Sequence, residues 1–234
     1  GGSTGALRVR LSALSVQRAP AVSWRRAVFC SSGAVFERRG DYVFFGLQAV
    51  FNVYGEDVLR QKLHDVIESG TSIETPAEKN AYYKRIASIL LEDVPFLEYG
   101  FWDLITKRGE AESEFNRWVT EIQATMATEE EELGEDIDEM YRLSADKTYV
   151  VVTLLFLLEN TERLDPFFDR VNEVEEDAYF TKAGFTDLFQ SLPYLDFDFA
   201  HGDASFIMPG NEQDGISWED LKGEGWEYLM PVTL

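Results

Sequence analysis

Four polar side chains near the C-terminal end of the chain have types and a spacing that could hold a metal ion. They are Asp196, Asp198, His201 and Asp203, in the segment YLDFDFAHGDASFIM. Two aspartates two positions apart share one face of a β-strand, and a turn at His201-Gly202-Asp203 could bring the other two side chains near them. Carboxylates with one imidazole bind Mg²⁺, Mn²⁺ or Zn²⁺. A metal-bound water would make such a site a hydrolase.

The same segment has a simpler interpretation, in which Phe197 and Phe199 face the core and the two aspartates face solvent. The sequence contains no G-x-S-x-G, no phosphate-binding glycine loop and no C-x-x-C. The other histidine, His64, lies among charged neighbours in a predicted helix, which is typical of a surface histidine. We therefore expect no catalytic residue and no cofactor, with a divalent metal at 196–203 as the alternative.

A second candidate site is the aromatic segment FLEYGFWDLI at 96–105. Its aromatic residues are Phe96, Tyr99, Phe101 and Trp102. One interpretation is an exposed recognition surface for a protein partner that carries basic residues, since acidic helices surround the segment. The other is a short apolar segment that fills the core between helices. The sequence leaves both open.

Charge is distributed unevenly along the 234 residues, whose formal net charge is −22. Residues 1–40 hold seven arginines and one acid, so the remaining chain is more acidic than the total suggests. An acidic body repels nucleic acid and anionic membranes. The single cysteine, Cys30, excludes an intramolecular disulfide. The uncharged run at 149–158 is too short to cross a bilayer as a helix.

Residues 1–40 have the Ser, Ala and Arg content of an organellar transit peptide. The opening Gly1-Gly2-Ser3 also fits a processed start or a segment added by cloning. We expect this basic leader to be disordered and dispensable. The expected location is cytoplasmic, or plastid or mitochondrial if residues 1–40 are a genuine transit peptide.

The segment around which the other elements are expected to pack is YVVVTLLFLL at 149–158. Its aromatic and β-branched residues and its two apolar faces predict a strand in the middle of a sheet. Alternation of apolar residues predicts further strands at 43–54 and within 195–208, and 226–234 could add an edge strand. Helical periodicity or capping signals occur at 56–69, 75–91, 110–126, 167–174, 178–192 and 217–220.

These elements predict a single α+β domain at 41–234, with a small three- to four-stranded sheet covered by amphipathic helices. Its N-terminal half (55–141) is expected to be helical and its C-terminal half (146–234) to be β-α-β. We expect the domain to be a soluble accessory or protein-binding module without catalytic activity. The alternative is the metal-dependent hydrolase.

The C-terminal part carries a set of short motifs in a fixed order. They are Phe206-Ile207-Met208-Pro209, then Asp214-Gly215-Ile216-Ser217-Trp218-Glu219-Asp220-Leu221, then Tyr228-Leu229-Met230-Pro231-Val232. Together with the valine-rich strand, and with Ile89-Leu90-Leu91 before Pro95, this order resembles the domain of unknown function 1517 family. The usual arginine after those leucines is replaced by Glu92-Asp93, and the Tyr-Pro near the end by Trp226-Glu227. The resemblance implies a regulatory or membrane-adjacent accessory role and no reaction.

Overall fold

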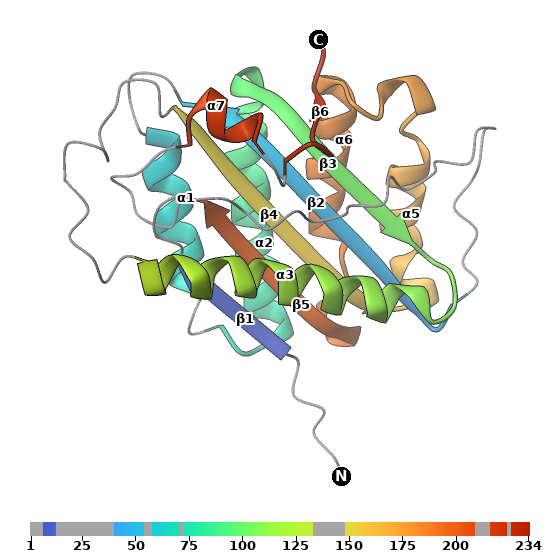
Figure 1. Ribbon diagram of the computed structural model, residues 1–234. Helices are drawn as coiled ribbons and strands as arrows, with labels where there is room; N and C mark the ends of the chain where they lie inside the picture. Colours follow the sequence, from blue (N-terminus) through green and yellow to red (C-terminus); the bar gives the residue numbers. More distant parts are fainter. Residues whose placement is uncertain are drawn as a thin grey trace.

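The chain folds into a mixed sheet with helices on both faces, as shown by a computed structural model (Figure 1). The structure describes residues 7–12, 40–53, 58–70, 73–132, 148–208, 216–223 and 226–234. The strands are β1 (Leu7–Ser12), β2 (Tyr42–Asn52), β3 (Leu97–Ile105), β4 (Tyr149–Glu159), β5 (Ala200–Met208) and β6 (Met230–Pro231). The helices are α1 (Val58–Ser69), α2 (Pro76–Glu92), α3 (Glu110–Glu132), α5 (Asp165–Asn172), α6 (Lys182–Ser191) and α7 (Trp218–Leu221).

Six strands form the sheet in the order β1-β5-β4-β2-β3-β6. β1 pairs in parallel with β5, and the other neighbours are antiparallel. The valine-rich strand β4 has neighbours on both sides and is buried from Tyr149 to Leu158, as the sequence predicted. The mixed α and β class is therefore confirmed, whereas the predicted three to four strands were too few.

The two faces of the sheet are covered by different helices. The first face carries α1, α2, α5 and α6, which lie behind the sheet in Figure 1. The second face carries α3, which crosses in front of the sheet, together with α7 and the C-terminal residues 226–230. Alternate residues of β2 and β4 enter the two cores, because successive side chains of a strand point to opposite faces.

Several predicted elements are confirmed at close to their expected positions. Thr75 accepts a hydrogen bond from the Glu78 amide, and the Glu78 carboxylate accepts one from the Thr75 amide, so the capping box of α2 is present. Ser217 and Asp220 form the same arrangement at α7. The predicted last edge strand is the short strand β6.

Two strands were not anticipated. The aromatic segment that includes Phe101 is strand β3, paired with β2 over most of its length, and it lies in the half expected to be helical. Leu7–Ser12, within the leader expected to be disordered, forms β1 beside β5. The rest of the leader, 1–6 and 13–39, lies outside the described residues.

The segment with the candidate metal ligands also differs from expectation. Phe197–Phe199 is one turn of 3-10 helix, and His201 to Asp203 lie within a single strand, β5. No hairpin turn occurs at His201-Gly202-Asp203. The register between β4 and β5 shifts between Leu157 and Leu158, which marks a β-bulge.

Candidate functional site

Asp196 and Asp198 lie close together, but a cation of the same chain already binds them. The Asp196 carboxylate caps the 3-10 turn by accepting the Asp198 amide at 3.0 Å. The Arg163 guanidinium lies 3.3 Å from the Asp196 carboxylate and 3.2 Å from that of Asp198. These two carboxylates therefore serve as partners of an arginine on the protein surface.

The side chains of His201 and Asp203 lie on opposite faces of the sheet, because the β-bulge interrupts the regular alternation of side chains along β5. His201 Nε2 lies 3.0 Å from a Glu159 oxygen, and its ring packs edge-on against Tyr42 at 4.5 Å. Asp203 instead faces α2, where it pairs with Lys79 and accepts the Tyr83 hydroxyl at 3.0 Å. The structure does not bring the four predicted metal ligands together.

The wider set of possible ligands gives the same result. Within the described ranges, no group of three or more His, Cys, Asp or Glu side chains has the arrangement of a metal site. His64, predicted to be a surface residue, is 1% exposed. Its nearest charged neighbours, Lys62 and Asp65, are exposed, whereas Arg60, Leu63, His64 and Ile67 form one buried stripe of α1 at helical spacing.

The four aromatic residues predicted to bind a partner lie in different environments. Phe101 is 5% exposed and Trp102 is fully buried, so neither can form an exposed contact surface. The Trp102 indole N–H donates to the Tyr179 carbonyl at 3.0 Å. Phe96 is 53% exposed, and Tyr99 is partly exposed on the second face. The core-filling interpretation therefore holds for Phe101 and Trp102, and the recognition hypothesis stays a prediction for Phe96 and Tyr99.

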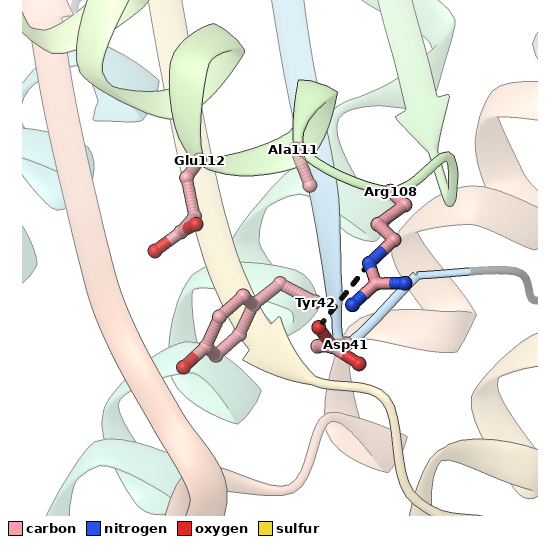
Figure 2. A pocket seen from close by; sticks show the side chains of 6 residues that line it. Asp41, Tyr42, Arg108, Ala111 and Glu112 are labelled. Carbon is pink, nitrogen blue, oxygen red and sulfur yellow. Dashed lines mark ion pairs between the residues drawn. The ribbon is translucent and has the colours of Figure 1, made fainter.

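A small pocket lies where β2 begins, beside the first turn of α3 (Figure 2). Its volume is about 150 Å³, and it is lined by Asp41, Tyr42, Arg108, Gly109, Ala111 and Glu112. Figure 2 shows the Arg108–Asp41 pair on one side and the Glu112 carboxylate above the Tyr42 ring on the other. The lining combines one cation with two carboxylates and contains no Ser, Thr or Cys nucleophile.

Charged and hydroxyl groups are buried between α2 and β5 on the first face. Lys79 and Asp203 are 6% and 2% exposed and form a buried ion pair. The Tyr82 and Ser205 hydroxyls lie 2.7 Å apart beside it. Because each of these groups has a partner, the cluster has the character of a structural network that fixes how α2 docks on the sheet.

A buried carboxyl group lies under α3 on the second face. Burial raises the pKa of Asp103 from 3.8 to about 7, and the nearby Glu114 carboxylate adds to the rise. Arg117 pairs with Glu114 and Glu121 on the same helix and acts in the opposite direction on Asp103. Asp103 is therefore a titrating group inside the packed layer between β3 and α3.

Three aromatic rings meet at one end of the second face, near the start of α7. The rings of Tyr99 and Trp218 are 5.3 Å apart, and the Tyr149 ring lies 6.3 Å from that of Trp218. Trp218 is 37% exposed. The Glu98 carboxylate accepts the Tyr149 hydroxyl at 2.7 Å and the Asn52 amide at 2.9 Å. We call Tyr99, Tyr149 and Trp218, with Glu98, the aromatic cluster.

Sequence reasoning found the parts of the aromatic cluster but not the cluster itself. The capping box placed Trp218 in the first turn of a short helix, and Tyr149 began the valine-rich strand. The missing information was that Ile216 pairs with Tyr149 through two backbone hydrogen bonds, of 3.0 and 3.1 Å. That bridge joins segments far apart in the chain and has no local signal.

The comparisons with known proteins give no relative from which a function could be transferred. No protein-family model, curated protein or solved structure matches the chain. The resemblance to the domain of unknown function 1517 family therefore stays a prediction. Among the described helices, none is both long and apolar enough to span a membrane.

Proposed function

We propose that this chain is an accessory module that binds a protein partner through the aromatic cluster. The observation that carries the proposal is the exposed Trp218 ring, supported by Tyr99 and Tyr149. Tryptophan and tyrosine contribute most to protein interfaces when they are held rigidly and present a broad apolar face. Here the strand pairing and the α7 capping box hold the rings.

Charge supports a basic partner. The chain has a net charge of −22, and two of its acidic residues, Glu219 and Asp220, lie in α7 next to Trp218. The Glu98 carboxylate lies within the aromatic cluster, where it accepts two hydrogen bonds. Complementary charge speeds association and discriminates against acidic partners, so a segment rich in lysine or arginine fits this face best.

The second candidate, a metal-dependent hydrolase, has no comparable support. A divalent metal needs its oxygen ligands within about 2.0–2.6 Å. Arg163, Glu159 and Lys79 instead hold the predicted ligands at three separate places. We expect the melting temperature to be unchanged by chelator and by added Mg²⁺, Mn²⁺ or Zn²⁺, because a bound metal would stabilise the fold.

Selection from a random peptide display library tests the proposal without knowledge of the natural partner. The full chain should enrich peptides that carry lysine or arginine, and Trp218→Ala should lose that enrichment. Tyr194→Ala is the matched control, because Tyr194 is also an exposed aromatic residue but lies outside the aromatic cluster. Equal enrichment by Trp218→Ala and the parent chain would show that the binding face is elsewhere.

A further inference from the structure

The aromatic cluster already holds a cation in this structure. The Lys222 ammonium lies 4.5 Å from the centre of the Trp218 ring, at a distance typical of a cation–π contact. Lys222 follows directly after α7, one helical turn beyond Trp218. The contact shows that the exposed Trp218 ring can bind an ammonium group.

Two other exposed rings in the described part of the chain are also covered by a cation, but these cations are anchored. Arg170 lies over Tyr194 and also donates to its hydroxyl at 2.8 Å. Arg163 lies over Phe199 while it binds two aspartates. These two arginines cannot leave their rings without losing further hydrogen bonds or ion pairs.

Lys222 is held far more weakly. Besides the ring, its ammonium lies 3.7 Å from the Glu219 carboxylate, in a pair whose side chains are 51% and 83% exposed. Such an exposed pair contributes little to stability, because water screens the two charges and holding two long side chains in place costs entropy. Tryptophan is also the best cation–π acceptor among the side chains. Trp218 therefore combines the strongest acceptor with the most easily displaced cation.

We infer that Lys222 is a built-in occupant of a cation site on Trp218, and that a lysine or arginine of the protein partner displaces it on binding. The inference rests on the proposed function and specifies its chemistry. Tyr99 and Tyr149 pack against the Trp218 ring, and the Glu98 carboxylate supplies negative charge within the same cluster. The partner group would exchange one ammonium for another ammonium or a guanidinium, so no new charge has to be buried.

Fluorine NMR of the fluorotryptophan-labelled chain tests this site, with an alternating glycine–lysine octapeptide as the probe. A glycine–glutamine octapeptide is the uncharged control, and Trp218→Phe identifies the Trp218 signal. The lysine peptide should change the chemical shift of the Trp218 signal, and this change should saturate as the peptide concentration rises. Lys222→Gln should tighten binding by about two- to fivefold, because the competing cation–π contact of about 0.5–1 kcal/mol is removed.

Lys84→Gln is the matched control for charge, because Lys84 is exposed on α2 and its loss changes the net charge equally. The inference is overturned if Lys222→Gln and Lys84→Gln change the affinity by the same factor, or if the peptide leaves the Trp218 signal unmoved. In either case the proposed function stands if Trp218→Ala still loses its display enrichment, and it fails if that enrichment persists. A melting temperature equal to that of the parent chain establishes that each variant is folded.

Discussion

At the scale of single residues, the most informative group is the Asp103 carboxyl under α3. An unfolded aspartate titrates near 3.8, whereas burial and the Glu114 carboxylate raise the pKa of Asp103 to about 7. The folded chain therefore binds an extra proton between about pH 4 and pH 7. Stability from this group is fully present below that window, and it is lost as the pH rises through it.

Replacing the carboxyl with a neutral amide tests this assignment. Asp103→Asn should raise the free energy of unfolding at pH 8 by about 2–4 kcal/mol and leave it nearly unchanged at pH 4, since each pKa unit corresponds to about 1.4 kcal/mol. Urea unfolding at both pH values gives the comparison. Equal effects at pH 4 and pH 8 would contradict a raised pKa at this position.

From residue types alone, we could predict what each side chain can do chemically, but we could not predict which groups surround it in the fold. Carboxylates at Asp196 and Asp198 suggested a metal, yet the residue that binds both is Arg163, from a segment that no spacing rule links to them. His64 was expected to be exposed because its sequence neighbours are charged, but helix neighbours point in other directions. Long-range partners decided both outcomes.

At the scale of elements, helix ends were predictable because capping is local, as in the boxes at Thr75 and Ser217. Strand β3 was not predictable, because a strand covered by helices on both faces shows no alternation of apolar and polar residues. Trp102 enters the core under α6, and Phe101 packs under α3. Nor could the β-bulge at His201 be anticipated, because it depends on the register with β4. Pairing between strands was the missing information in both cases.

The buried Lys79–Asp203 pair joins α2 to β5 and allows a test of how these elements are held together. Lys79→Met should destabilise the fold by about 3–5 kcal/mol, because it leaves a buried carboxylate without its cation. Lys84→Met, on the exposed side of the same helix, should change stability by less than about 0.5 kcal/mol. Urea unfolding of the two variants gives both values.

The double variant Lys79→Met with Asp203→Asn tests whether the two side chains stabilise the fold as an ion pair or contribute independently to the free energy of unfolding. If the two side chains act as a pair, the double variant should be at least about 1 kcal/mol more stable than the sum of the single effects predicts. Strict additivity would mean that the two groups do not interact in solution.

At the scale of the whole molecule, the net charge of −22 implies repulsion among surface carboxylates. Raising NaCl from about 20 mM to about 0.5 M should therefore increase the melting temperature by a few degrees, because the Debye length falls below typical charge separations. The same change should weaken binding of the lysine peptide. A melting temperature that is flat or falls with salt would contradict a repulsive acidic surface.

The class of the molecule, mixed helix and strand around the valine-rich strand β4, followed from sequence pattern because that strand's signal is local and strong. The placement of α7 against the start of β4 could not be predicted from the sequence pattern, because the backbone bridge between Ile216 and Tyr149 joins two segments that are distant in the chain. The aromatic cluster on which the proposed function rests is a product of this tertiary pairing.

Hydrogen exchange of the full chain, with and without the glycine–lysine octapeptide, tests most directly whether the aromatic cluster is the binding face. Binding there predicts slower amide exchange in residues 97–100 and 216–223, with no change around the pocket at Arg108 or around the exposed Tyr194. Slower exchange confined to other segments, or none at a peptide concentration that saturates the Trp218 signal, would contradict the assignment of this face as the site of partner binding.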